Sequence, residues 1–375
     1  MKPPGVSPRP QDILAKVKDQ VMRPSSEVEL SEIIQGAQAL QIKGGGTRGL
    51  GRVVGEVLDT SGLSGVELYE PGALTLVAQA GTTLAAIETL LASERQRLAF
   101  EVPDLRGLLA REGVSTIGGV VAANASGPRR VQVGACRDAL LGVRFVDGRG
   151  DVIKNGGRVM KNVTGYDLVK LMAGSQGALG VLTAVSFKVQ AVPEATVTLA
   201  AERALPQGLA DLRAALGSPY DISAAAWADG RAMIRLEGMA GSVAYRVGKL
   251  RDLLGFEAAV TDWAAVRDVS AFAGRAGAVW KLSIKPTEAA RVIAALGLEA
   301  ICDWGGGLVW LLDPSGRADV RGVVAGIGHA TLMRGLPGME AVPRFPPEAP
   351  AVAALTAGLR AKFDPRGIFN PGMMG

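Results

Sequence analysis

Three glycine-rich segments in the first half of the chain constrain its fold more than any other feature. The first, residues 41–52, reads QIKGGGTRGLGR and places five glycines beside three cationic residues. The other two are STIGGVVAANASGPRR at 115–130 and GYDLVKLMAGSQGALGVLT at 165–183. Small residues let a backbone approach a flat ligand closely and offer it N–H and C=O groups. One such loop can be a simple surface turn, but three in one domain predict a ligand site.

The first segment does not fit the two best-known phosphate-binding motifs. The pattern G-x-G-x-x-G occurs at 44–49, but a dinucleotide fingerprint needs a long helix after its third glycine. The following LGRVVG carries two more glycines and two valines, which disfavour that helix. No Gly-Lys-Ser/Thr follows, so the segment is not a Walker loop. We interpret residues 44–48 as a nest of backbone N–H groups around an anion such as a pyrophosphate, with Lys43 and Arg48 beside it.

Composition excludes several classes of protein. With 375 residues, 48% of them apolar and 21% charged, the chain is expected to fold, by default into two domains. It has neither a signal-like leader nor 18 consecutive apolar residues, so a cytoplasmic location is expected. A scattered net charge of +5 with 5% aromatic residues argues against a nucleic-acid partner. Two cysteines, Cys136 and Cys302, cannot form an iron–sulfur site, so any such cluster belongs to another chain, and we interpret them as packing thiols.

Local patterns predict several elements of an α+β domain. Ser26 with Glu29 three residues later predicts the capped start of an amphipathic helix. Asp167 is typical of a helix start, where its charge meets the positive end of the dipole. Apolar periodicity predicts the following elements: a helix within 25–40, a strand at 75–80, a helix at 81–92, two strands within 141–153 and a strand at 181–189.

The order of these motifs resembles one flavoprotein superfamily. A first helix followed by KGGGTR, LDTSGL, EPGALTLVAQAGTTL, STIGGVVAANASG, GSQGALGVLT and FDPRGIFNPG is similar to the FAD-binding domain of the vanillyl-alcohol oxidase / p-cresol methylhydroxylase (PCMH-type) superfamily. Within it, VMKNVTGYDLVKLMAGS, DWGGGLVWLL and GHATLMR resemble the FAD-binding (E) subunits of bacterial glycolate oxidases. The resemblance implies an α+β fold with a flexible tail at 1–22, a two-lobed FAD-binding domain at 23–192, a smaller cap domain at 193–330 and a segment at 331–375 that returns to the FAD domain.

The same resemblance implies which residues bind FAD. The first loop would wrap the pyrophosphate, the second would line the ribityl chain and the isoalloxazine, the third would hold the adenosine, and the C-terminus would return near the flavin. The residues are Gly44, Gly45, Gly46, Thr47, Arg48, Thr116, Gly118, Gly119, Asn124, Gly127, Gly177, Gly180, Val181 and Asn370. Asn124 and Asn370 could equally be turn residues that cap their own backbone. Neither the first nor the second loop contains a His or Cys, so the FAD is expected to be non-covalent.

No catalytic residue follows directly from the sequence. Related 2-hydroxy-acid dehydrogenases use several histidines as metal ligands and as a base, whereas this chain has one, His329, so no metal is expected. His329 is a weak candidate base, because a lone histidine among apolar residues is more often a buried, hydrogen-bonded residue than a catalyst. Arg129 and Arg130 could bind an acidic substrate, or they could be exposed cations of a solvated face or a subunit contact.

The function implied is that of an FAD-binding subunit in a multi-subunit glycolate (2-hydroxy acid) dehydrogenase. Glycolate would be oxidised to glyoxylate, beside a homologous catalytic flavin subunit and an iron–sulfur subunit that passes electrons onward. The complex would be cytoplasmic and peripheral to the inner membrane only through its partners. Two alternatives stay open: a self-sufficient FAD-dependent 2-hydroxy-acid dehydrogenase, and a non-catalytic assembly subunit that binds FAD as structure. A reductase that uses NADPH is more distant.

Overall fold

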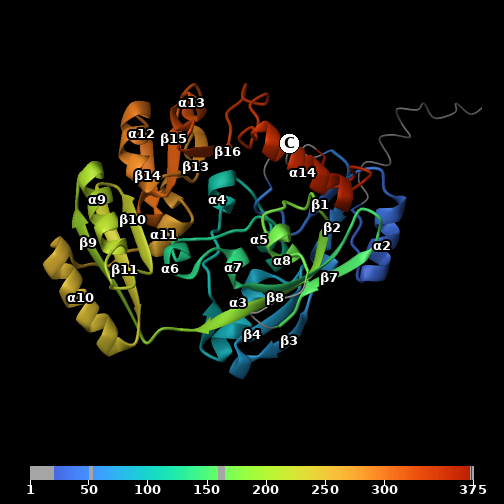
Figure 1. The fold of residues 1–375 in the computed structure, drawn as a ribbon, viewed down its shortest axis with the longest axis horizontal. Coiled ribbons are helices and arrows are strands. Elements are labelled where there is room, and N and C mark those ends of the chain that lie inside the picture. Colours follow the sequence, from blue (N-terminus) through green and yellow to red (C-terminus); the bar gives the residue numbers. More distant parts are fainter. Residues whose placement is uncertain (1–20, 50–53, 159–164, 372, 374–375) are drawn as a thin grey trace, which may run out of the picture.

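Two lobes lie side by side in the molecule (Figure 1). The computed structural model describes residues 21–49, 54–158, 165–371 and 373, so most of the predicted N-terminal tail lies outside the described residues. The first lobe comprises the elements from α2 to β8 together with the C-terminal segment from α14 onward. The second lobe runs from β9 to β16. β16 continues past residue 330, where the sequence analysis ends the second domain.

The first lobe combines short helices with two sheets. Its helices are α2 (Glu27–Gly36), α3 (Leu84–Ser93), α4 (Arg106–Leu109), α5 (Ile117–Ala122), α6 (Arg130–Val133), α7 (Cys136–Ala139), α8 (Leu168–Met172) and α14 (Pro350–Phe363). Its strands are β1 (Leu40–Lys43), β2 (Glu56–Asp59), β3 (Val66–Glu70), β4 (Thr75–Gln79), β5 (Gln96–Leu98), β6 (Leu140–Val146), β7 (Val152–Gly156) and β8 (Val181–Ala191). β1 and β2 form a parallel pair, and the other six form an antiparallel sheet in which β8 is central.

Local sequence signals account for the predicted elements of this lobe. The Ser26 hydroxyl accepts the backbone N–H of Glu29 at 3.2 Å and begins α2, as predicted. Asp167 caps α8 by accepting the N–H of Lys170 at 3.0 Å. The predicted helix at 81–92 is α3, and the predicted strands correspond to β4, β6, β7 and β8. These predictions are confirmed. The elements could be predicted because each depends on residues a few positions apart in the chain.

The second lobe is built on one antiparallel sheet of eight strands in the order β12-β9-β11-β10-β14-β15-β13-β16. Its strands are β9 (Ala195–Glu202), β10 (Ala224–Ala228), β11 (Arg231–Gly238), β12 (Glu257–Ala258), β13 (Ala278–Ile284), β14 (Glu299–Asp303), β15 (Leu308–Asp313) and β16 (Gly328–Arg334). Its helices are α9 (Leu205–Leu216), α10 (Ala240–Leu254), α11 (Trp263–Arg267), α12 (Ala289–Leu296) and α13 (Val320–Val324).

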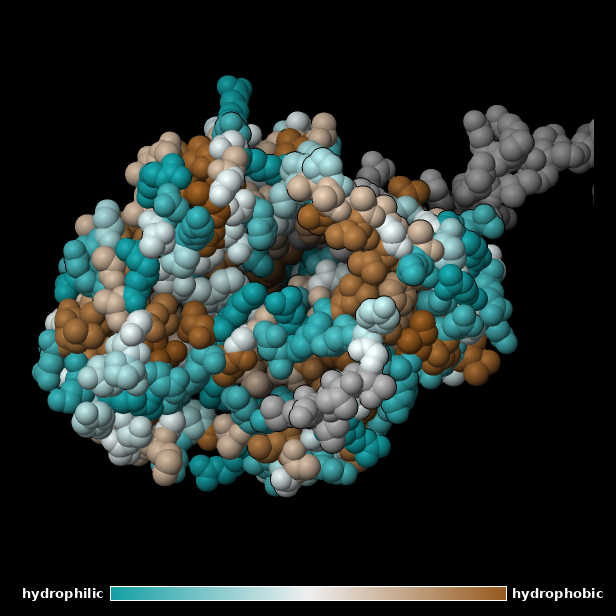
Figure 2. Space-filling model, in the orientation of Figure 1, coloured by the Kyte–Doolittle hydropathy of each residue, from teal (hydrophilic) through white to brown (hydrophobic). Residues whose placement is uncertain are grey.

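The two faces of this sheet have different environments. Trp280 and Leu282 of β13 pack into the main core of the lobe with residues of α9, α10, α12 and α13. Because side chains alternate along a strand, Lys281 and Ser283 project from the opposite face. That face carries a smaller apolar cluster shared with Leu105 and Leu108 of the first lobe. The second sheet therefore turns part of one face toward the first lobe, and Figure 2 shows the surface hollowed where the lobes meet.

The C-terminal segment returns to the beginning of the first lobe, as Figure 1 shows by its proximity to β1 and β2. The Leu40 N–H donates to the Ile368 carbonyl at 2.7 Å, and the Asn370 N–H donates to the Leu40 carbonyl at 2.9 Å. Ile368 and Phe369 are buried against α2 and β1. Residues 368–370 thus complete the core beneath the first glycine loop.

Candidate functional site

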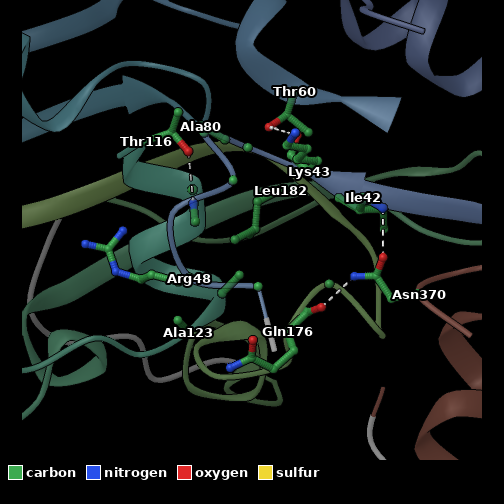
Figure 3. Close-up of a pocket in the computed structure, with 18 of the residues that line it drawn as sticks. Ile42, Lys43, Arg48, Thr60, Ala80, Thr116, Ala123, Gln176, Leu182 and Asn370 are labelled. Carbon is green, nitrogen blue, oxygen red and sulfur yellow. Dashed lines mark hydrogen bonds between the residues drawn. The ribbon is translucent and has the colours of Figure 1, made fainter. Parts of the chain in front are cut away.

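The three glycine-rich segments and the C-terminus converge on one cavity of about 410 Å³ (Figure 3). Its wall contains most of the predicted FAD-binding residues. Those that line it are Gly44, Gly45, Gly46, Thr47, Arg48, Thr116, Gly118, Gly119, Gly177, Gly180 and Asn370. We call this space the first cavity. The tertiary structure thus brings together segments that lie far apart in the chain, as in the contact between Ile42 and Asn370, which are 328 residues apart.

The first loop has the geometry of an anion nest. Among the described residues, none accepts a hydrogen bond from the backbone N–H groups of residues 44–48. Gly46 has a positive φ of 72°, which curls the backbone and favours glycine at this position. Consecutive free N–H groups in such a curve suit a phosphate.

Gly45 is a glycine for a different reason from its neighbour. A Cβ on Gly45 would lie 1.4 Å from the carbonyl oxygen of Val114, and a Cβ on Gly113 would lie 2.0 Å from the carbonyl oxygen of Gly45. A Cβ on Gly44 would come within 2.4 Å of Thr116 Oγ1. The first and second loops are therefore interlocked backbone against backbone, so the shape of the nest depends on residues 113–116.

The second loop begins a short helix at the cavity wall. Thr116 is the N-cap of α5, and its hydroxyl accepts the N–H of Gly119 at 3.4 Å. The N–H of Gly118 donates to the Ala80 carbonyl at 2.7 Å, and a Cβ there would lie 2.7 Å from the Ala80 Cβ. Gly118 thus permits close packing of α5 on the strand end at Ala80, while Gly119 meets only the Thr116 hydroxyl, at 3.3 Å.

Asn370 joins three distant segments. Its Oδ1 accepts the N–H of Ile42 and its Nδ2 donates to the Gln176 carbonyl, both at 2.7 Å (Figure 3). It is buried, with a φ of 42°. The alternative that Asn370 caps its own backbone does not describe these bonds, which hold the first loop to the third. Sequence analysis did not name Ser175 and Gln176 among the site residues, although both line the same cavity and belong to the quoted motif GSQGALGVLT.

Three predicted residues lie elsewhere. Asn124, with a φ of 46°, accepts the N–H of Arg137 at 3.1 Å through Oδ1, which fits a loop-stabilising role, and it does not line the first cavity. Val181 is fully buried in the sheet, where it pairs with Val146. Gly127 lines a second cavity. A motif shows that a loop is present but not which of its atoms face the ligand.

Two buried polar atoms at the first cavity lack a partner in the described part of the chain: Arg48 Nε and Ser175 Oγ. The other Arg48 nitrogens are held: NH1 donates to Ser115 Oγ at 2.6 Å and NH2 to the Pro103 carbonyl at 2.8 Å. Burial lowers the pKa of Arg48 from its ordinary value, so an anion nearby would stabilise its charge. With the free N–H groups of the nest, these donors fit the pyrophosphate and ribityl chain of FAD.

A second cavity of about 290 Å³ lies between the lobes and shares Arg48, Ala123 and Gln176 with the first. The first lobe contributes Gly127 and Arg130. The second lobe contributes residues from the four neighbouring strands β14, β15, β13 and β16 and from the turn after β14. They include Lys281, Ser283, Asp303, Trp304, Trp310, His329 and Thr331. Because the cavities adjoin, a flat ligand that extends from the first would reach the second.

The second cavity contains unusual titratable groups. Burial, and next the positive charge of Arg130, lower the pKa of Lys281 to about 8. Burial raises the pKa of Asp303 to about 7, against the effect of the Trp304 N–H, which donates to its Oδ1 at 2.7 Å. His329 lies opposite Ser283 and is exposed. The expectation that His329 is a buried, hydrogen-bonded residue is therefore wrong in its burial, because the apolar neighbours Ala330 and Leu332 project from the other face of the strand.

The adjacent arginines 129 and 130 have different environments, and the expectation of two exposed cations is wrong. Arg129 is 4% exposed, and its Nε lies 3.0 Å from the Glu237 carboxylate of the second lobe. Arg97 also pairs with Glu237 at 3.0 Å, while Arg235 pairs with Glu101 of the first lobe at 2.9 Å. These buried ion pairs fix the lobes to one another. Arg130 instead stacks over the Trp304 ring at 4.6 Å.

The remaining predictions concern thiols, metals and membranes. Cys136 and Cys302 are buried and unpaired, and burial raises the pKa of the Cys302 thiol to about 12, so both are packing residues as predicted. Within the described residues, no group of three His, Cys, Asp or Glu side chains could hold a metal ion. In the same residues, no helix has the length and apolar character needed to cross a membrane.

Comparisons with known proteins agree with this geometry. Residues 18–156 match the family described as FAD binding domain. The chain is 35% identical over 351 residues to glycolate oxidase subunit GlcE of Escherichia coli (strain K12), covering 92% of this chain and 95% of that protein. It is 42% identical over 88 residues to glycolate oxidase subunit GlcD of Bacillus subtilis (strain 168), covering 24% of this chain and 19% of that one.

The fold has a solved counterpart. A structure of alkyldihydroxyacetonephosphate synthase superposes with a TM-score of 0.66 over 94% of this chain and 75% of its own, at 15% identity. This likeness confirms the predicted PCMH-type α+β fold. The identity to GlcE over almost the full length of both proteins is decisive for the family. The chain belongs to the family of FAD-binding glycolate oxidase subunits, a group of FAD-dependent oxidoreductases.

Proposed function

We propose that this chain is the FAD-binding subunit of a multi-subunit 2-hydroxy-acid dehydrogenase that oxidises glycolate to glyoxylate. The observation that carries the proposal is the pair of adjoining cavities with a shared wall at Arg48, Ala123 and Gln176. One cavity offers free N–H groups for a pyrophosphate, and the other offers cations for an acid. The full-length similarity to a glycolate oxidase subunit supports the choice of acid.

Each part of the first cavity has a task in this proposal. The N–H groups of residues 44–48 bind the pyrophosphate, and the interlock with residues 113–116 preorganises them. Arg48 Nε and Ser175 Oγ acquire partners on the cofactor. The Asn370 bonds hold the first and third loops at a fixed separation. When bound, FAD would accept the two electrons that leave the α-carbon of the acid with its hydrogen.

The partners belong to the same proposal. Two buried cysteines cannot hold an iron–sulfur cluster, so electrons leave through another chain. A homologous flavin subunit, to which the similarity with GlcD points, and an iron–sulfur subunit complete the complex. Any association with the inner membrane is made by those partners.

The cofactor is tested first. The purified chain should hold one FAD, which acid or heat releases into the supernatant, because neither of the first two loops offers an attachment residue. A flavin that stays with the denatured polypeptide would refute non-covalent binding, and a chain that cannot be loaded with FAD would refute the function itself.

Anaerobic mixing of the FAD-loaded chain with glycolate tests whether the isolated chain oxidises the acid or needs its partner subunits. Loss of the hydroxyl proton needs a base whose pKa is near neutral. Related catalytic subunits use a cluster of histidines, and this chain has one histidine. The flavin of the isolated chain should bleach slowly, and the reconstituted complex should bleach rapidly. Rapid bleaching of the isolated chain, abolished by His329→Ala, would favour the self-sufficient dehydrogenase. A flavin that no reductant or partner reduces would favour an assembly role.

A further inference from the structure

Two cations of the second cavity have no anionic partner. Arg130, at the start of α6, stacks on Trp304, and Lys281 of β13 lies with its Nζ 5.8 Å from the Trp310 ring centre. Neither side chain has a hydrogen bond or an ion pair with any residue in the described ranges. The other cations of the wall differ: Arg267 pairs with Asp268 at 2.7 Å, and Arg48 is held by Ser115 and Pro103.

We propose that Arg130 and Lys281 bind the carboxylate of a small organic acid, in a site that the two lobes complete together. The proposal rests on the proposed function in taking that acid to be the 2-hydroxy acid. Both side chains are half-buried and line the same cavity. Unpaired charges in such a place are costly, and a carboxylate that enters the cavity offsets the cost. The planar guanidinium can accept it in a bidentate geometry, and the ammonium group acts as a point charge.

The motif DWGGG explains how Arg130 is positioned. The Trp304 Nε1 donates to the Gly127 carbonyl at 3.1 Å, so this turn of the second lobe is tied to the loop that precedes Arg130. Trp304 has a φ of 54°, which is rare for a bulky residue, and the next two glycines have φ of 65° and 101°. The strained turn places the indole under the guanidinium. Trp304 is therefore a positioning residue for the acid.

The remaining wall suits an acid that carries a hydroxyl group. Thr331 lies opposite Lys281 across the strand pair, and His329 lies opposite Ser283. All four side chains line the cavity, so hydroxyl and imidazole groups lie on the same wall as the ammonium group. A carboxylate at Arg130 and Lys281 would leave its α-hydroxyl among these donors and acceptors. This arrangement distinguishes a 2-hydroxy acid from a simple fatty acid.

The experiment measures binding and does not depend on turnover. The probe is 2-hydroxy-2-methylpropanoate, which has the carboxylate and the hydroxyl but no hydrogen on its α-carbon to lose. Calorimetry on the FAD-loaded chain should show binding, and the neutral amide of the same acid should not bind. Arg130→Gln and Lys281→Met should each weaken binding roughly ten- to a hundredfold, the loss of one charge-assisted hydrogen bond. The exposed neighbours Arg137→Gln and Lys285→Met are matched controls and should bind as wild type.

The pH dependence separates a direct role from a structural one. Below about pH 8 Lys281 carries its proton, so affinity should fall as pH rises through about 8. Asp303 becomes negative above about pH 7, so affinity for the acid should also fall as pH rises through about 7. Lys281→Met should abolish the fall in affinity near pH 8, and Asp303→Asn should abolish the fall near pH 7. Arg130→Gln should keep both. The charged or titratable groups that share the cavity with Lys281 are Arg48, Arg130, Arg267, Asp303 and His329.

Trp304 is tested by two variants. Trp304→Phe retains a ring under Arg130 but loses the bond to the Gly127 carbonyl, so it should weaken binding less than Trp304→Leu, which removes both contacts and should approach the loss seen with Arg130→Gln. Circular dichroism and the FAD affinity of each variant check that the lobes remain folded. The inference is overturned if the FAD-loaded chain does not bind the probe, or if Arg130→Gln and Lys281→Met bind it as tightly as the controls. Either result leaves the flavin subunit assignment standing, because that assignment fails only when FAD itself does not bind.

Discussion

Replacing Gly45 by alanine should push the first loop away from residues 113–116, which hold its backbone in place. The new Cβ would lie 1.4 Å from the Val114 carbonyl oxygen and 2.5 Å from its carbon. An ordinary carbon–oxygen contact is about 3.3 Å, so the first and second loops must separate by about 2 Å. Both neighbours are backbone atoms, which cannot be relieved by a change of rotamer. The N–H groups of residues 44–48 would then leave the positions that the interlock holds.

The magnitude follows from the bonds at risk. If the shift removes two charge-assisted hydrogen bonds to the pyrophosphate, each contributing about 1.5–3 kcal/mol, the Kd for FAD should rise by about two to four orders of magnitude. Gly46→Ala should have a smaller effect, because it strains a positive φ of 72° and meets mainly the flexible Lys43 side chain. Gly49→Ala, in the same loop, is the matched control, since no atom of the described residues lies within 4 Å of a Cβ at that position.

The assay is titration of the apo-protein with FAD, followed by flavin fluorescence, beside thermal unfolding of each apo-variant. A loss of affinity with an unchanged Tm would place the defect in the nest. Wild-type affinity for Gly45→Ala would refute the reasoning, because it would mean that residue 114 gives way or that the phosphate lies elsewhere. Equal damage from Gly49→Ala would also contradict it.

Three further outcomes are expected. Asn370→Ala should destabilise the chain by about 1–3 kcal/mol in urea unfolding, since it removes the bonds to Ile42 and Gln176, while Asn370→Asp should keep the first of them. Asp303 holds its proton more tightly when folded, with a pKa of about 7, so the free energy of unfolding should fall between about pH 4 and 7 by up to about 1.4 kcal/mol per unit and then level off. Asp303→Asn should lose that slope, and a wild-type curve without it would contradict the burial argument. Glu237→Gln should cost about 3–5 kcal/mol, because Arg97 and Arg129 lose their buried carboxylate, whereas the exposed Glu202→Gln should be neutral.

Features that depend on near neighbours in the chain could be predicted from the sequence. The Ser26 and Asp167 caps, the alternating strands β4 and β8 and the three loops of small residues all arise from residues a few positions apart. Backbone sterics and local hydrogen bonds act over that range, so their patterns can be read without a fold. The glycine loops by themselves predicted a ligand site with an anion-binding nest, and the choice of FAD came from the resemblance of the motif order to a flavoprotein superfamily.

The role of each of those residues depends on contacts that form only in the folded chain. Position 45 requires glycine because the Val114 carbonyl lies against it. Asn370 contacts Ile42 and Gln176, from which it is separated by 328 and 194 residues. His329 faces a cavity, although its neighbours in the chain are apolar. Arg130 and Lys281 share that cavity only because the lobes close on one another. Such contacts form between segments far apart in the chain, and local patterns carry no information about which segments will meet.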